Sequence, residues 1–282
     1  MLLSLPGSTG NSELSLLAGL DPGVLWATAL IVGLGYSLSC ARRNRLDQRA
    51  LYVAGLFGIV FGLWGGHLLG IFYYGTDGRP LAWLRFWSGG QAQYGGLIAG
   101  CTAVLLFLRF RKVPPLAYAD AMAPAAALGV SIGRIGCFLN GDDFGSLSGL
   151  PWAVQFSPGT EAYSDHLARG WIHSTDALSL PVHPIQLYAS LLWLSFFVIL
   201  TVRRQQRPGL CLALFLILQG LGRFAEQFLR GDFQPILGPL SLTQIISLLF
   251  IAAGTGLWRY QSVRVAQDRL RAIAPLPSVA GD

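Results

Sequence analysis

Charged side chains inside otherwise apolar stretches are the residues of this sequence most able to do chemistry. The segment GRIGCFLNGDDFG, residues 133–145, places Arg134 among small and apolar residues. A guanidinium presents five N–H donors in a planar fork, which fits a phosphate or a carboxylate in a bidentate manner. Arg134 therefore has two interpretations: it binds the phosphate of a phospholipid, or it closes a buried salt bridge. The carboxylates available for such a bridge are Asp142, Asp143 and Glu226.

A second charged stretch, GRFAEQFLRGD at residues 222–232, carries its polar side chains on one helical face. Positions i, i+3, i+4 and i+7 of a helix share a face, and here they hold Arg223, Glu226, Gln227 and Arg230. The spacing predicts a local ion pair between Arg223 and the carboxylate of Glu226. Arg230 lies near the end of the apolar stretch, so we expect its long side chain to extend to the membrane interface.

The elements that carry these side chains are apolar enough to cross a membrane. Of the 282 residues, 53% are hydrophobic and 12% are charged, and the mean hydropathy is +0.52, which is typical of an integral membrane protein. Stretches of about 17 to 25 mostly apolar residues can cross roughly 30 Å of hydrocarbon. They predict an all-α, seven-transmembrane helix bundle, with spans at residues 24–40, 51–74, 95–108, 116–139, 185–202, 210–229 and 242–258. The third span is short, and Pro124 in the fourth predicts a kink or a partly re-entrant course.

Basic residues indicate the orientation of these spans, because Lys and Arg concentrate in short cytoplasmic loops. Four clusters follow the first, third, fifth and seventh spans and hold most of the 20 basic residues. All four lie on one side if the N-terminus is outside and the C-terminus is cytoplasmic, which is the orientation we predict. The net charge of +6 then reflects topology and does not indicate nucleic-acid binding. The clusters are Arg42, Arg43, Arg45 and Arg49; Arg109, Arg111 and Lys112; Arg203, Arg204 and Arg207; and Arg259, Arg264, Arg269 and Arg271.

We interpret residues 1–282 as a single transmembrane domain whose longest hydrophilic connection, residues 140–184, forms a small cap on the outer face. The first 20 residues lack the basic n-region of a cleavable signal peptide, so the first span is expected to be the insertion signal. The four cysteines show no CxxC spacing and no arranged histidine partner, so we predict no disulfide framework, no metal site and no cofactor. The aromatic residues that suit a folded cap at the interface are Trp152, Phe156, Tyr163 and Trp171.

Glycine recurs every four residues along the second span, at Gly58, Gly62, Gly66 and Gly70. Small residues at this spacing give a smooth face, and we expect a neighbouring helix to pack on it. Contact with a lipid chain is the alternative. His67, beside this stripe, is interpreted as a structural histidine.

Four segments together resemble the bacterial prolipoprotein diacylglyceryl transferases. GRIGCFLNGDDFG is similar to the family signature G-R-x-G-N-F-x-N-x-E-x-x-G. Three further segments match in order and spacing, so that the resemblance covers nearly the whole chain. GGQAQYGGLIAG (residues 89–100) is similar to the glycine-rich third-span motif, HPIQLYA (183–189) to HPSQLYE, and GRFAEQFLRGD (222–232) to the RFxxExxRxxD region.

The resemblance implies an enzyme of the bacterial inner membrane. Such an enzyme transfers the diacylglyceryl group of phosphatidylglycerol to the lipobox cysteine of a prolipoprotein, which forms a thioether and releases glycerol phosphate. This reaction needs a cation that stabilises the leaving phosphate and a base that converts the thiol to a thiolate. By position in the motifs, the expected catalytic residues are Arg223, Tyr94, His183, Asp142 and Glu226, and the expected substrate-binding residues are Arg134, Arg223, Gly95, Gly96, Asn140 and Gly145.

The chain departs from the family at positions that concern activation of the thiol. A tyrosine hydroxyl is almost wholly neutral at pH 7, so the tyrosine in place of the family histidine cannot take the thiol proton, although it can donate to a phosphate. A carboxylate moved by one helix position is rotated by about 100°. The departures are Tyr94 for histidine, Cys137 for asparagine, Asp142 for glutamate, Gln227 for glutamate with Glu226 one step earlier, Ala27 for tyrosine and Ala189 for glutamate.

Two functions therefore stay open. One is a transferase that acts on phosphatidylglycerol, with a prolipoprotein or a related acceptor; the other is a non-catalytic protein that binds or moves phospholipid. His183 is either a base or, as we favour, a residue that orients the loop before Pro184. Cys137 either packs as a small apolar residue, as we favour, or is a nucleophile that a bound lipid modifies.

Overall fold

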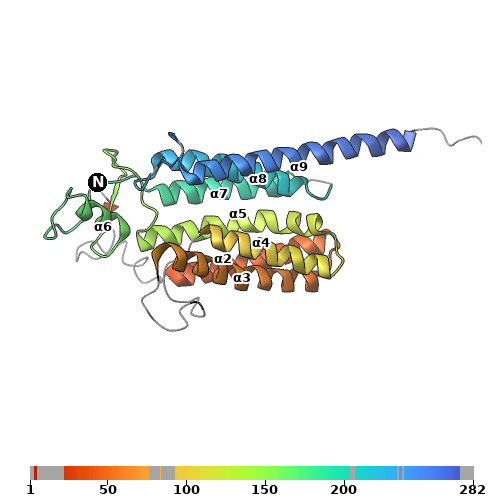
Figure 1. Cartoon of the computed structure of the whole chain (residues 1–282), viewed down its shortest axis with the longest axis horizontal. Helices are drawn as coiled ribbons and strands as arrows, with labels where there is room; N and C mark the ends of the chain where they lie inside the picture. The colour runs from red at the N-terminus through yellow and green to blue at the C-terminus, as the bar shows by residue number, and fades with distance from the viewer. Residues whose placement is uncertain are drawn as a thin grey trace, which may run out of the picture. The chain divides into compact units, whose positions relative to one another are not determined.

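The computed structural model describes residues 3–4, 22–75, 83, 93–203, 207–233, 235–236 and 238–273. The regular elements of the described residues are helices (Figure 1), together with one two-residue parallel strand pair. In this pair Leu3 of β1 lies opposite Val154 of β2. Three parts of the chain discussed above lie outside the described residues: the first 20 residues apart from Leu3 and Ser4, residues 89–92 of the glycine-rich motif, and Arg204. The elements are β1 (Leu3–Ser4), α2 (Pro22–Arg43), α3 (Gln48–Tyr74), α4 (Gln93–Phe110), α5 (Pro115–Asn140), β2 (Val154–Gln155), α6 (Glu161–Ala168), α7 (Ile185–Val202), α8 (Leu210–Glu226), the 3-10 helix η2 (Gln227–Leu229) and α9 (Leu242–Ile273).

Six helices within the described residues are long and apolar enough to cross a membrane. The expected third span corresponds to a shorter apolar stretch of α4, Tyr94–Phe110. These helices confirm the prediction of an all-helical, multi-pass membrane protein. The six are Gly23–Arg43, Gln48–Phe72, Pro115–Asn140, Ile185–Val202, Leu210–Leu229 and Leu242–Arg264.

The fourth expected span is a single uninterrupted helix. α5 runs for 26 residues and passes through Pro124 without ending. Of the two alternatives predicted from Pro124, a kink or a partly re-entrant course, the continuous helix excludes the re-entrant course. A proline removes one backbone donor, but in a membrane span the freed carbonyl can be accommodated by local adjustment and by neighbouring helices.

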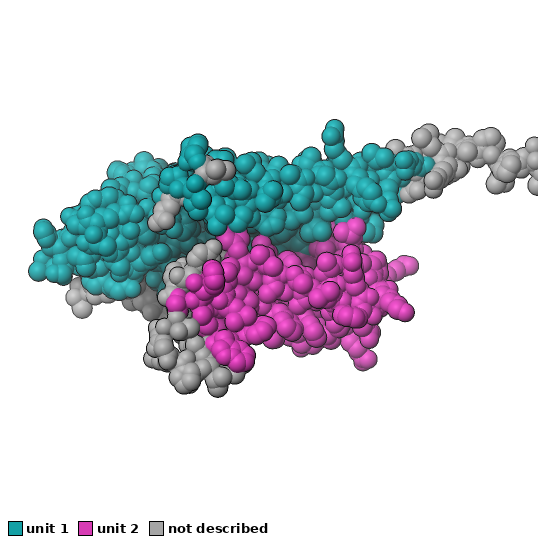
Figure 2. Space-filling model, in the orientation of Figure 1, with its two compact units in different colours: residues 1–32, 123–282 teal, residues 33–122 magenta. Residues whose placement is uncertain are grey.

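The chain divides into two compact units (Figure 2), and the second of them, unit 2, comprises residues 33–122. In unit 2 the glycine stripe of α3 packs on α4: a Cβ on Gly96 would lie 2.9 Å from the carbonyl oxygen of Gly62, and one on Gly65 would lie 2.6 Å from that of Gly95. Only glycine allows the backbones to approach this closely. The expected helix contact is confirmed, and His67 is buried beside it.

Unit 1 comprises residues 1–32 and 123–282. Its helical core includes Trp193 and Phe196 of α7, whose ring centroids lie 5.5 Å apart. Residues 141–184 fold onto the end of α5 around a second apolar cluster, which contains Phe138, Phe144 and Phe156. Of the aromatic residues expected to build this segment, Phe156 and Tyr163 are buried, whereas Trp152 and Trp171 are exposed.

Candidate functional site

Two buried arginines of unit 1 share one carboxylate. Arg134 Nη1, from α5, donates to Asp143 Oδ2 at 2.5 Å. Arg230 Nη1, which follows η2, lies 2.6 Å from the other oxygen, Asp143 Oδ1. Both arginine side chains are about nine-tenths buried, whereas the Asp143 side chain is 34% exposed. Of the partners expected for Arg134, Asp143 is the one that forms the salt bridge.

A second carboxylate holds Arg230 in place. Its Nε and Nη2 atoms donate to Asp232 Oδ1 and Oδ2, each at 2.6 Å, in a bidentate pair. The guanidinium therefore binds two carboxylates and is 11% exposed. Arg230 follows directly after the apolar stretch Leu210–Leu229, but its guanidinium is buried and paired with carboxylates and does not extend freely into solvent. Sequence reasoning identified Arg230 but missed its pair with Asp143, because the two residues are far apart in the sequence.

The ion pair expected within α8 is present. Arg223 Nη1 donates to Glu226 Oε2 at 2.7 Å, one turn along the helix, and both side chains are more than nine-tenths buried. The other oxygen, Glu226 Oε1, is also buried and has no hydrogen-bond partner among the described residues. Glu226 interacts electrostatically with Arg134, and Arg223 with Asp143. The ion pairs Arg134–Asp143, Arg230–Asp232 and Arg223–Glu226 thus form one cluster, in which three arginines are paired with three carboxylates.

The loop after α5 positions Asp143 by its backbone conformation. Gly141 and Asp143 both have positive φ, 71° and 54°, and the Asp143 N–H donates to Glu161 Oε2 at 2.8 Å. A non-glycine residue in the left-handed region is uncommon, although aspartate tolerates it better than most. The turn directs the Asp143 carboxylate to the two arginines.

The segment after this loop pairs with the segment after η2. Ser146 N donates to the carbonyl of Leu229 at 2.7 Å, and Gly231 N donates to that of Phe144 at 3.0 Å. A Cβ on Gly231 would lie 2.8 Å from the carbonyl oxygen of Gly145. This pairing brings Arg230 to Asp143. Gly145, which we expected at the substrate site, lies in this backbone contact.

The electrostatic environment keeps Asp143 ionised. Burial raises the pKa of this carboxyl, but the guanidinium groups of Arg134 and Arg230 outweigh burial and hold the pKa well below its usual value. Burial likewise opposes the charge on Arg230, and the carboxylates of Asp232 and Asp143 reverse this effect and raise its pKa. Asp143 and Arg230 therefore both carry their full charge at neutral pH.

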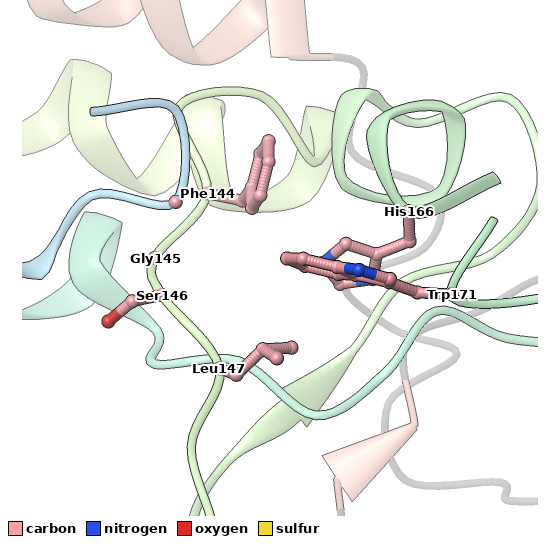
Figure 3. Close-up of a pocket in the computed structure, with 7 residues that line it drawn as sticks. Phe144, Gly145, Ser146, Leu147, His166 and Trp171 are labelled. Carbon is pink, nitrogen blue, oxygen red and sulfur yellow. The ribbon is translucent and has the colours of Figure 1, made fainter. Parts of the chain in front are cut away.

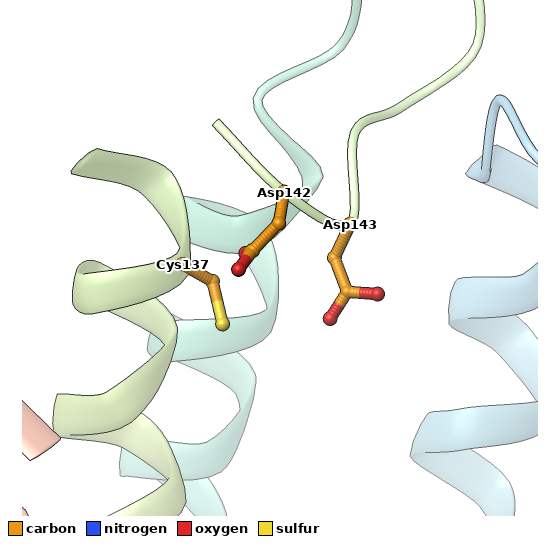
Figure 4. A group of neighbouring side chains, drawn as sticks. All are labelled: Cys137, Asp142 and Asp143. Carbon is orange, nitrogen blue, oxygen red and sulfur yellow. The ribbon is translucent and has the colours of Figure 1, made fainter. Parts of the chain in front are cut away.

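Asp142 has a different environment from its neighbour (Figure 4). Asn140 Nδ2 donates to Asp142 Oδ2 at 2.9 Å, and the thiol of Cys137 also interacts with this carboxylate, whose buried Oδ1 has no other partner in the described part of the chain. Burial raises the pKa of the Asp142 carboxyl. The ligand atoms of Cys137, Asp142 and Asp143 lie within 4.8 Å of one another, but two guanidinium groups on Asp143 oppose the binding of a cation there.

The HPIQLYA segment lies against the same loop. His183 N donates to the carbonyl of Ser146 at 3.0 Å, and the His183 ring meets Tyr188 edge to face, with ring centroids 6.2 Å apart. Gln186 Nε2 donates to the carbonyl of Asp142 at 2.7 Å. Gln186 is a supporting residue that sequence reasoning missed, although it lies inside a matching motif. The remaining expected residues, Tyr94, Gly95 and Gly96, belong to α4 of unit 2.

A cavity of about 310 Å³ lies beside the loop (Figure 3). His166 of α6 is at one wall; its Nδ1 accepts a hydrogen bond from Leu180 N at 3.2 Å, and burial lowers its pKa. The cavity therefore has a neutral, mainly apolar wall next to the charged cluster. Its lining residues are Phe144, Gly145, Ser146, Leu147, His166, Trp171 and Gly231.

Comparison with known proteins points to one family. Residues 22–260 match the family model described as prolipoprotein diacylglyceryl transferase. A phosphatidylglycerol–prolipoprotein diacylglyceryl transferase of Synechococcus elongatus is 31% identical over 264 residues, which cover 92% of this chain and 88% of that protein. Proteins of the same name from Verminephrobacter eiseniae and Burkholderia multivorans are each 36% identical, over 76% and 74% of this chain and 74% and 78% of their own lengths.

Proposed function

The chain belongs to the prolipoprotein diacylglyceryl transferase family, and on this basis we propose that it transfers the diacylglyceryl group of phosphatidylglycerol to the lipobox cysteine of a prolipoprotein. The buried arginine cluster is the observation that carries this proposal. Buried guanidinium groups bind phosphates tightly and in a defined orientation. In the proposed reaction Arg134 binds the lipid phosphate. Arg223 balances the negative charge of the Glu226 carboxylate within the cluster.

The reaction exchanges one bond for another at the glyceryl carbon. The thiolate sulfur forms a C–S bond, the C–O bond to the phosphate breaks, and glycerol phosphate leaves with the electron pair. Negative charge therefore develops on the phosphate in the transition state, and fixed guanidinium groups stabilise it without reorganisation. The thiol proton must pass to a base.

Asp142 is the residue that we favour as this base. Its Oδ1 is buried, its carboxylate already interacts with the thiol of Cys137, and burial raises its pKa, which strengthens a carboxylate as a proton acceptor. His183 is the alternative base, because its buried Nδ1 likewise has no hydrogen-bond partner among the described residues; its backbone N–H donates to Ser146 whatever the role of the ring. Asn140, which donates to Asp142, is a further candidate contact to the lipid headgroup, whereas Gly145 is closely packed against the backbone of His183.

We extend the proposal to topology and location. Seven spans form a single domain in the bacterial inner membrane. They are the six helices long enough to cross a membrane and the shorter apolar stretch of α4. The N-terminus is outside and the C-terminus cytoplasmic, which is supported by the basic clusters. Residues 140–184 then form a cap on the periplasmic face, where prolipoprotein arrives.

The test measures glycerol phosphate released from labelled phosphatidylglycerol by the purified protein with a lipobox peptide. We expect release that depends on the peptide cysteine and is lost in Arg134→Ala. Arg259→Ala is the matched control, because this arginine is exposed on α9 and should leave release unchanged. Bound phosphatidylglycerol without any release would instead support the non-catalytic lipid-binding function.

A further inference from the structure

The Asp143 carboxylate holds the two arginine contacts that a phosphate would use. Its two oxygens each receive one guanidinium, from Arg134 and Arg230. A phosphodiester likewise has two anionic oxygens and one negative charge, so the two groups compete for the same donors. We propose that Asp143 closes the phosphate site in the lipid-free protein, and that the lipid headgroup enters by displacing it. This inference rests on the proposed function, in which Arg134 binds the phosphate.

The charge balance requires that one carboxylate yield to the incoming phosphate. The three arginines of the cluster are paired with three carboxylates, and two further carboxylates, Asp142 and Glu161, lie beside Asp143, so no arginine charge is left uncompensated before a ligand binds. A bound phosphodiester adds a further negative charge to a largely buried site, which is costly unless a carboxylate moves into water. The phosphate therefore binds by exchange of anions.

Asp143 is the carboxylate best placed to move. Its side chain is 34% exposed, whereas that of Glu226 is 7% exposed and lies on a helix. Its backbone has a φ of 54° in a short loop, a conformation that costs energy for a residue other than glycine. Asp232 is equally exposed but pairs with Arg230 alone, so its departure would not free Arg134.

Displacement makes Asp143 a determinant of lipid affinity. Removing its charge should free both guanidinium groups and tighten binding of phosphatidylglycerol about tenfold, as expected when a partly buried competing ion pair is lost. Asp143→Asn keeps the size of the side chain, and asparagine tolerates positive φ. Asp143→Gly removes the carboxylate and suits the backbone conformation, and it serves as a second variant.

The experiment titrates short-chain phosphatidylglycerol into the full-length protein in detergent and measures the dissociation constant by calorimetry. Asp232→Asn is the matched control, because it changes the net charge by the same amount but leaves Arg134 paired. We expect Asp143→Asn and Asp143→Gly to tighten binding about tenfold and Asp232→Asn to change it much less. Adding Arg134→Ala to either Asp143 variant should abolish the gain in affinity. Without lipid, both Asp143 variants should have a lower melting temperature, and phosphatidylglycerol should raise it by more than in the wild type.

The outcomes separate this inference from the proposed function. If the wild type binds phosphatidylglycerol and the Asp143 variants bind equally or more weakly, the displacement is overturned and the transferase proposal stands. Equal gains in the Asp143 and Asp232 variants also overturn it, because they indicate a general effect of charge. Tighter binding by the Asp143 variants, combined with no glycerol phosphate release by the wild type, supports the inference and contradicts the transferase. Absence of binding in every protein overturns both.

Discussion

Arg223 and Glu226 form a buried ion pair across one turn of α8, with 2.7 Å between Nη1 and Oε2. Removal of one partner would leave an uncompensated charge in a largely buried place. We expect Glu226→Ala to lower the free energy of unfolding by roughly 3 to 5 kcal/mol, as measured by denaturant titration in detergent. Asp165→Ala, which breaks the more exposed pair with Arg169, should cost no more than about 1 kcal/mol. If Glu226→Ala and Asp165→Ala lower the free energy of unfolding equally, the buried pair contributes no more to stability than the exposed one, which contradicts the prediction.

The close contact between two backbone segments predicts a steric effect at Gly231. A Cβ there would meet the Phe144 ring and the carbonyl oxygen of Gly145 at 2.8 Å, so Gly231→Ala should push apart the pairing that brings Arg230 to Asp143. We expect a loss of about 1 to 3 kcal/mol in stability and a clear drop in glycerol phosphate release. Gly149→Ala is the control, since a Cβ at Gly149 meets nothing within 4 Å and should change neither measurement.

The parts of this structure that depend on local sequence were predictable. Apolar runs of sufficient length predicted the helices, and the i, i+3 spacing predicted the pair between Arg223 and Glu226. The choice of Asp143 as the partner of Arg134 depends instead on a turn with positive φ, which no periodicity indicates. The position of Arg230 depends on pairing between segments about 85 positions apart in the chain, Ser146 with Leu229, so spacing along one helix could not reveal it.

Asp143 predicts a defined dependence of stability on pH. Its pKa is lower in the folded protein than the usual value near 3.9 because two guanidinium groups favour the ionised form. The stabilising contribution of this carboxylate is therefore fully present above the unfolded-state pKa and is lost as the pH falls through the folded-state pKa. Asp143→Asn should be less stable than the wild type by a constant amount above about pH 5, and the difference should shrink below about pH 4. A difference that stays constant in acid would show that Asp143 does not titrate as described.

Asp142 predicts the pH dependence of catalysis. A carboxylate base must be ionised, and burial raises the pKa of Asp142, so kcat/KM should rise with pH along an acid limb that lies above that of an ordinary carboxyl. Asp142→Asn should lower glycerol phosphate release by about 10² to 10⁴ and remove this limb. Asp165→Asn should retain both the rate and the limb. If Asp142→Asn is slower but keeps the limb, Asp142 is a positioning residue that acts through Asn140 and the loop, and His183→Gln becomes the decisive variant, because loss of the limb there would identify the histidine as the base.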